Sequence, residues 1–240
     1  MKNKTLIQTG LLMLAFTVGV FKAQALTPGP TIIRECPQCK KPLMQFTIGS
    51  GNSRGARLWT DGKMDAPGMP LWSGLGKCPH CQELFWIADA KKLGEIGWTT
   101  LVASPEDTAR WEKAPQIATP TEADHLLAAE AKDVSHQHEE QARRWAWWVA
   151  NDAIRANPGP RYTWSGPRRQ NLEKLSLLLD DQKECDVVQK AEIARELGQF
   201  EVCLKFLDRE FGQDCDESFV AFIRKLANEK KTNVAVLPQG

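Results

Sequence analysis

Two Cys-Pro-x-Cys tetrapeptides carry the residues of this sequence best suited to chemistry. Cys36 and Cys39 form "CPQC", and Cys78 and Cys81 form "CPHC". Paired cysteines of this kind, separated by strand-and-turn sequence, are typical of sites in which two hairpin tips supply four thiolates to one tetrahedral ion. The spacing therefore predicts a Cys₄ metal site, with zinc as the expected ion. The same ligands suit iron in a rubredoxin-like site, and the sequence does not separate the two metals.

The pattern fits a zinc ribbon with one enlargement. The 38 residues between Cys39 and Cys78 exceed the usual spacing of about 15–20, so the Gly/Pro-rich segment 49–76 is expected to be an inserted loop. The residue after the second cysteine of such a turn often has positive φ and is usually glycine, but here it is Lys40 and Gln82. Four protein ligands leave no open coordination position, which predicts a structural rather than a catalytic ion.

Two other interpretations of the cysteines stay open. A thiol–disulfide oxidoreductase would use Cys78 and Cys81 as a redox pair, but it needs a helix that starts at the cysteines, and "QELFWIA" after Cys81 favours a strand. Disulfide bonds are the second alternative, because exported cysteines usually oxidise.

The N-terminal residues 1–25 have the layout of a secretory signal. Lys2 and Lys4 precede an apolar run over residues 11–21, and Ala23-Gln24-Ala25 offers a cleavage site. Export to the periplasm or the extracellular medium is expected, with no integral membrane segment after cleavage. Removal of these residues takes away three lysines and no acid, so the formal charge changes from +1 to −2. A near-neutral chain lacks the basic patch that nucleic-acid binding requires, so no nucleic-acid partner is expected.

The composition and the apolar spacing along the chain predict an α+β protein with two modules. Residues 31–98 are rich in Gly, Pro and short apolar runs, which favours a small β-rich ribbon; the first helical spacing there covers residues 89–96. Residues 99–120 carry three prolines and are expected to be a linker. Residues 121–230 have apolar spacings of three and four, which predicts an all-α domain. Its first helix or helix pair should run from Glu122 to Ala156, where "NPGP" follows.

The helical part resembles a tetratricopeptide (TPR) helix pair over "KAEIARELGQFEVCLKFLDREF", with Gly198 at the turn and Cys203 at a small-residue position. Since one such repeat is recognisable, the domain is described as TPR-like. Antiparallel packing around Gly198 would bring Cys185 near Cys215, and a disulfide between them is a further prediction.

Other candidate residues have simpler interpretations. His136 and His138 diverge on a helix and are expected to face solvent, while Trp145, Trp148 and Val149 form an apolar stripe expected to pack. The sequence has no phosphate loop and no recognisable nucleophile motif. These observations favour a binding protein over an enzyme.

Five segments together resemble a family of bacterial zinc-ribbon proteins with a helical, TPR-like C-terminal half and no assigned activity: "ECPQCKKPL", "ARLWTDGKMDAPGMP", "KCPHCQELFWI", "RRWAWWVANDAIR" and "KAEIARELGQFEVCLKFLD". The resemblance implies the same architecture and metal ligands, and it transfers no catalytic residue. The expected function is an exported, non-enzymatic scaffold or interaction protein whose helical half binds another protein.

Overall fold

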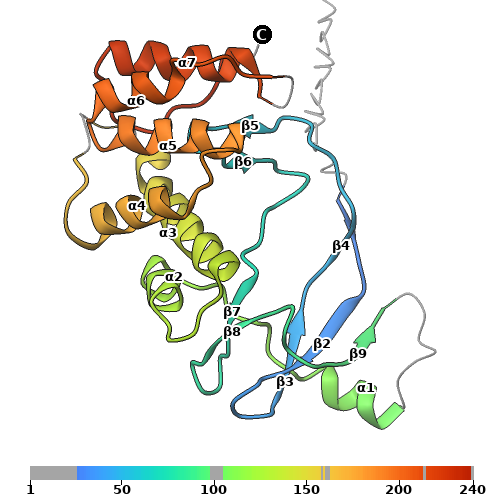
Figure 1. The fold of residues 1–240 in the computed structure, drawn as a ribbon. Coiled ribbons are helices and arrows are strands. Elements are labelled where there is room, and N and C mark those ends of the chain that lie inside the picture. The colour runs from blue at the N-terminus through green and yellow to red at the C-terminus, as the bar shows by residue number, and fades with distance from the viewer. Residues whose placement is uncertain (1–25, 98–104, 158, 160–162, 213–214, 239–240) are drawn as a thin grey trace, which may run out of the picture.

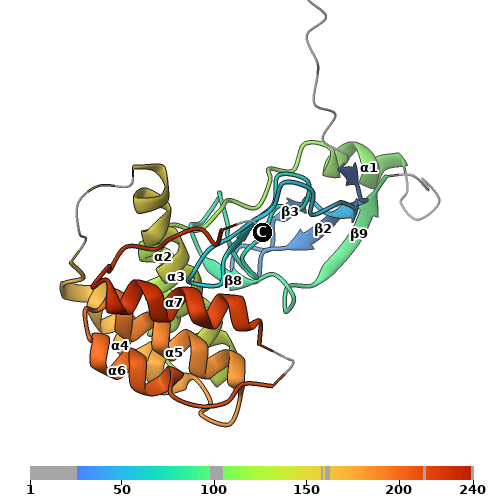
Figure 2. The same ribbon diagram turned by 90° about the horizontal axis from the view of Figure 1, so that it is seen from above.

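The computed structural model describes residues 26–97, 105–157, 159, 163–212 and 215–238. This part of the protein is mixed α+β, with small antiparallel sheets followed by helices, as expected. Figures 1 and 2 show the helices gathered on one side and the sheet of β2, β3 and β9 with α1 on the other. The predicted signal sequence lies outside the described residues. None of the described helices is both long and apolar enough to cross a membrane.

The strands pair only antiparallel in the described part of the chain. The elements are β1 (Thr27–Pro28) with β4 (Ile48–Ser50), β2 (Thr31–Glu35) between β3 (Pro42–Gln45) and β9 (Lys92–Ile96), β5 (Arg57–Leu58) with β6 (Met64–Asp65), and β7 (Leu75–Lys77) with β8 (Leu84–Trp86). Each cysteine pair lies at the tip of a hairpin, the first between β2 and β3 and the second between β7 and β8.

The helical spacing over residues 89–96 gives a wrong prediction, because β9 occupies most of that stretch. Gly94 lies opposite Ile33 in the ladder with β2. A Cβ atom at Gly94 would lie 2.4 Å from the Trp111 ring, so the strand passes directly under that indole. Pairing and packing of this kind override a weak local helical preference.

The expected linker, residues 99–120, contains ordered elements that join the two hairpins. Helix α1 (Pro105–Trp111) lies within it, and residues 115–118 run between β3 and β7. Met44 N donates to Pro115 O at 2.9 Å, Ile117 N donates to Met44 O at 2.9 Å, and Ala118 N donates to Lys77 O at 3.0 Å. This segment therefore connects the strands that carry the two cysteine turns.

The remaining described helices are α2 (Glu122–Ala129), α3 (His136–Ala156), α4 (Gly166–Leu178), α5 (Glu184–Glu196), α6 (Phe200–Leu207) and α7 (Glu217–Asn228). The expected start at Glu122 is confirmed, and Thr121 forms a capping box with Asp124. Helix α3 ends at Ala156, before the predicted Pro/Gly stop. A helix pair therefore covers the stretch expected to be helical.

The buried face of α3 differs from the predicted stripe. Trp147 is 1% exposed, whereas Trp145, Trp148 and Val149 are only half-buried. Trp147 packs in a core cluster with residues of α4 and α5, including Leu172 and Ile193. His138 does not simply face solvent either, because its ring stacks on Trp86 with centroids 3.9 Å apart. This contact joins β8 to the start of α3.

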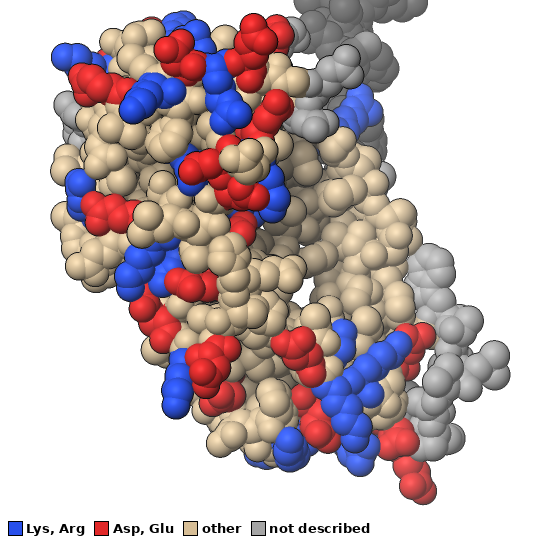
Figure 3. Space-filling model, viewed as in Figure 1, with Lys and Arg blue, Asp and Glu red and all other residues tan. Residues whose placement is uncertain are grey.

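The hairpin of β5 and β6 extends from the sheet part to the helices, and Figure 1 shows it beside α5. Its turn, residues 59–63, is held by the C-terminal segment: Thr60 N donates to Ala235 O at 2.9 Å, and Leu237 N donates to Leu58 O at 2.8 Å. The inserted loop is therefore anchored to the helical part. On the face shown in Figure 3, acidic and basic side chains lie interspersed over the helices.

Candidate metal centre

The two cysteine turns have the same backbone construction. In the first, Cys36 N donates to Lys41 O at 3.0 Å and Lys40 N donates to Cys36 O at 3.0 Å. In the second, Cys78 N donates to Glu83 O at 2.8 Å and Gln82 N donates to Cys78 O at 2.9 Å. Because the hydrogen bonds correspond position by position, the two turns present their sulfurs in the same way.

The residue after each second cysteine has the backbone conformation that the sequence suggested. Lys40 has φ 61° and Gln82 has φ 64°, both in the left-handed region. A side chain there costs about 1–2 kcal/mol relative to glycine. Because both turns adopt this conformation with a residue other than glycine, the shared hydrogen-bonded turn and not the local preference of Lys or Gln sets the backbone there.

The four sulfurs meet in one place. The Sγ atoms of Cys36, Cys39, Cys78 and Cys81 all lie within 4.8 Å of one another. The shortest cross-turn pairs, Cys36 with Cys81 and Cys39 with Cys78, are 3.7 Å apart. A tetrahedral ion with metal–sulfur bonds of about 2.3 Å has sulfur–sulfur edges of about 3.8 Å. The donor set and its dimensions therefore fit a tetrahedral thiolate metal site.

The site lies at the edge of a small apolar core. Cys36 and Cys78 are fully buried against Leu43 and Phe85, whereas Cys39 is half-buried and Cys81 is exposed. The first cysteine of each turn thus faces the protein and the second faces outward. One side of the cluster is shielded from water by protein, and the other is accessible for metal entry.

The thiol pKa values follow this asymmetry. Burial raises the pKa of Cys78 to about 12 and also raises that of Cys36, against the lowering effect of backbone N–H groups in each turn. A hydrogen bond from the backbone of Lys41 lowers the pKa of Cys39 to about 7. Buried thiolates need a compensating positive charge, which a bound cation supplies. Lys77 contributes little of it, because its Nζ is already paired with Asp124 at 2.9 Å.

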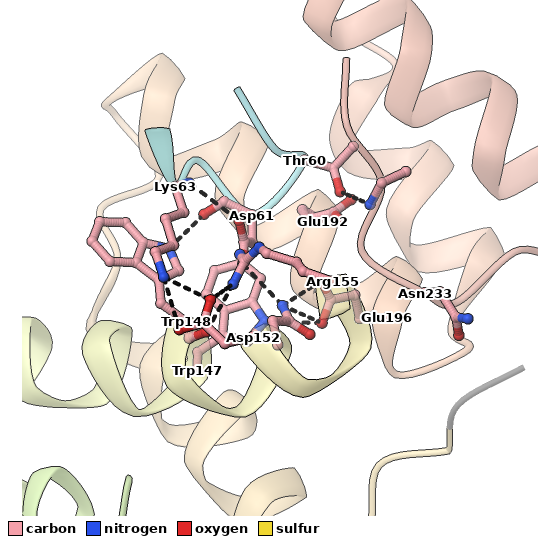
Figure 4. Close-up of polar contacts among 12 residues, drawn as sticks. Thr60, Asp61, Lys63, Trp147, Trp148, Asp152, Arg155, Glu192, Glu196 and Asn233 are labelled. Carbon is pink, nitrogen blue, oxygen red and sulfur yellow. Dashed lines mark hydrogen bonds and ion pairs between the residues drawn. The ribbon is translucent and has the colours of Figure 1, made fainter. Parts of the chain in front are cut away.

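The sequence did not predict a buried polar cluster around Asp61, which Figure 4 shows. Asp61, in the turn between β5 and β6, is 0% exposed. Its carboxylate accepts hydrogen bonds from Asn151 Nδ2 at 2.9 Å and from the Arg155 guanidinium, and Lys63 N donates to it at 3.1 Å. Trp148 Nε1 donates to its backbone oxygen at 3.0 Å. The turn is therefore held against α3 by side-chain and main-chain contacts.

The cluster continues into α5 and the C-terminal segment. Glu196 accepts from Trp147 Nε1 at 2.9 Å and from Asn151 Nδ2 at 3.1 Å. Arg195 pairs with Glu192 at 2.5 Å and donates to Asn233 O at 3.1 Å. Burial, and then the charge of Glu192, raise the pKa of Glu196 well above its usual range.

These acids are at most 1% exposed, so they have no open face toward a substrate. Their contacts position the inserted loop against α3 and α5. The sequence "WTDGKMD" predicts a turn at Asp61 and Gly62. It does not show that this turn is buried against a helix that lies far away in the sequence.

The remaining predicted site residues lie away from the metal centre. The sulfurs of Cys185 and Cys215 lie 3.8 Å apart, and a disulfide between them stays a prediction. Cys203 is 0% exposed in α6, as its small-residue position requires.

Comparisons with protein-family models, with curated proteins and with solved structures found no match.

Proposed function

We propose that this protein is an exported, non-enzymatic scaffold or interaction protein whose N-terminal part is a zinc ribbon with a structural Cys₄ site. The observation that carries the proposal is the convergence of four sulfurs from two equivalent hairpin tips within 4.8 Å. Four thiolates complete a tetrahedral shell and leave no position for water or substrate. The resemblance of the sequence to zinc-ribbon proteins supports the ribbon and its ligands, and it does not bear on the role because that family has no assigned activity.

The helical half is the proposed protein-binding part. Helices α5 and α6 meet at a tight turn where Gly198 has φ 76°, which supports a TPR-like helix pair. A groove of about 870 Å³ between the end of α6 and α7 is lined by both signs of charge, from Arg209, Arg224, Lys225, Glu210, Glu217 and Glu229. A peptide or helix with charges of both signs would suit this groove.

The rival function, a thiol–disulfide oxidoreductase that uses Cys78 and Cys81, has weaker support. Strand β8 follows the second cysteine turn where a redox dithiol would need a helix start. Sulfurs of different turns lie as close as 3.7 Å, so Cys78 and Cys81 belong to one group with Cys36 and Cys39 and do not form an isolated pair. A rubredoxin-like iron site would use the same geometry as zinc, so elemental analysis distinguishes those two.

The test is the metal content and thiol count of mature protein recovered from its own compartment. We expect one zinc ion per chain and four thiols that resist alkylation until a chelator is added. Cys78→Ser should abolish metal retention, because it removes a ligand. Cys185→Ser is the matched control, since that cysteine lies outside the four-sulfur group and should leave metal content unchanged.

Three results would contradict the proposal in different ways. Iron in place of zinc would make the site rubredoxin-like. Metal-free protein with two disulfides among the four cysteines, and a mass lower by about two hydrogens per bridge, would remove the metal. Rapid reduction of insulin that is lost in Cys78→Ser would favour the oxidoreductase.

A further inference from the structure

A cavity of about 460 Å³ lies beside the metal-centre core, on the side of the ribbon that faces residues 116–120. It is bounded by β3, by residues 72–75 that lead into β7, and by Ile87 and Ala88 after β8. Its volume falls within the range of about 300–1,000 Å³ that is typical of small-molecule sites. The residues of the metal site and of the polar cluster around Asp61 do not line it, so any role of the cavity is separate from both.

The wall of the cavity presents more apolar than polar surface, and two of the side chains that line it are exposed aromatic rings. Met44, Leu75, Ile87 and Ile117 supply apolar surface. Phe46 and Trp72 stand at 41% and 50% exposure, with ring centroids 5.8 Å apart in an edge-to-face arrangement. Exposed aromatic rings beside a cavity offer stacking surface to an apolar ligand at little entropic cost.

The cavity carries one charge. Arg34 is the only charged side chain among the described residues that line it. Its guanidinium is oriented by two hydrogen bonds, from Nε to Gln45 Oε1 at 2.9 Å and from Nη1 to Ala90 O at 2.8 Å. Guanidinium has five N–H donors, so three remain for a ligand. No described carboxylate forms an ion pair with Arg34, so none competes with a ligand as a direct partner of this guanidinium.

We propose that this cavity binds a small organic carboxylate with an apolar, aromatic body. The carboxylate would accept hydrogen bonds from Arg34, and the body would lie on the apolar wall between Phe46 and Trp72. Aromatic rims can also attract cations, but a fixed guanidinium in the same cavity repels them. The charge of Arg34 thus selects the anion.

The test uses the full chain and a matched pair of probes, 3-phenylpropanoate and 3-phenylpropylammonium, which differ in the sign of the head group. Isothermal titration calorimetry should give a dissociation constant for the carboxylate below about 1 mM, in keeping with a ligand of this size. The ammonium should bind at least tenfold more weakly. Arg34→Gln should weaken carboxylate binding about tenfold or more, because a charge-assisted hydrogen bond is lost.

Two further variants separate the cavity from general effects. Trp72→Ala changes a half-exposed ring and should fold normally, yet it should also weaken carboxylate binding. Arg54→Gln removes an exposed arginine outside the cavity and should leave binding unchanged. The proposal is overturned by a wild-type protein that does not bind the carboxylate, by equal binding of both probes, or by equal losses in Arg34→Gln and Arg54→Gln. None of these results depends on which metal the cysteines hold.

Discussion

Removal of the Asp61 carboxylate should destabilise the protein far more than removal of a neighbouring aspartate on the same hairpin. Asp61 is 0% exposed and accepts hydrogen bonds from Asn151 and Arg155, so Asp61→Ala removes one of the acceptors of each of these buried donors. Loss of one partner of a buried ion pair typically costs about 3–5 kcal/mol. Arg155 keeps a second partner, Asp152, at 2.7 Å, which places the expected loss near the lower limit, about 3 kcal/mol.

Asp65→Ala is the matched control. Asp65 pairs with Arg57 at 2.6 Å, but the two side chains are 45% and 56% exposed. Exposed pairs contribute about 0–1 kcal/mol. In a chain of this size, 1 kcal/mol corresponds to about 2–4 °C in Tm, so we expect a decrease of roughly 6–12 °C for Asp61→Ala and at most about 4 °C for Asp65→Ala.

Urea unfolding followed by circular dichroism would give both free energies. The helical signal is the appropriate probe, because the hairpin itself contributes almost no helix. A loss of helical stability in Asp61→Ala must therefore be transmitted to α3 and α5 through the contacts of Asp61. Asp61→Ala combined with Arg155→Ala should cost less than the sum of the single changes, since the orphaned guanidinium is then absent. Equal destabilisation by Asp61→Ala and Asp65→Ala would refute the reasoning.

Three other predictions concern protons and thiols. His125 is buried, and burial lowers its pKa from 6.5 to about 4. The unfolded chain therefore binds a proton that the folded protein excludes, so the free energy of unfolding should fall by about 3 kcal/mol as the pH drops from 6.5 to 4. In urea titrations at several pH values, His125→Phe should reduce this dependence of stability on pH. An unchanged dependence in the variant would contradict the prediction. Glu196 has the opposite sign: its raised pKa means that the folded protein retains a proton, so stability falls as the pH rises above the ordinary value of 4.5. Glu196→Gln should reduce that loss, measured as Tm between pH 5 and 8, and an identical loss in both proteins would count against a protonated Glu196. Cys185 and Cys215 should be linked in protein from an oxidising compartment, with reduction costing about 2–4 kcal/mol; peptide mapping without reductant that finds both cysteines alkylated would exclude the bond.

The local features of the metal centre were predictable from the sequence. The Cys-Pro-x-Cys spacing placed both turns at hairpin tips, and the position after each second cysteine predicted positive φ at Lys40 and Gln82. The ends of the helices at Thr121 and Asn157 were also predictable, because capping residues and Pro/Gly stop signals act within a few residues. Such signals depend on short-range sterics and hydrogen bonds.

The long-range pairings were not predictable in this way. Residues 115–118 begin with a proline, lie in a segment with three prolines and have little periodicity, yet they pair with β3 and β7. The buried face of α3 centres on Trp147, whereas the half-buried Trp148 indole donates to the backbone oxygen of Asp61, which lies 87 residues earlier. An aspartate in a "DG" turn normally faces water, and only the complementary Asn151 and Arg155 make its burial favourable.

The contacts between the C-terminal segment and the inserted hairpin also impose an order on folding. Arg195 donates to the carbonyl groups of Lys231 and Asn233, and Thr60 N donates to Ala235 O. Helix α5 and the hairpin therefore lack acceptors for buried donors until these residues have been synthesised. More than 170 residues follow the hairpin in the sequence. Its contacts with the C-terminal segment therefore form only when nearly the whole chain has been synthesised.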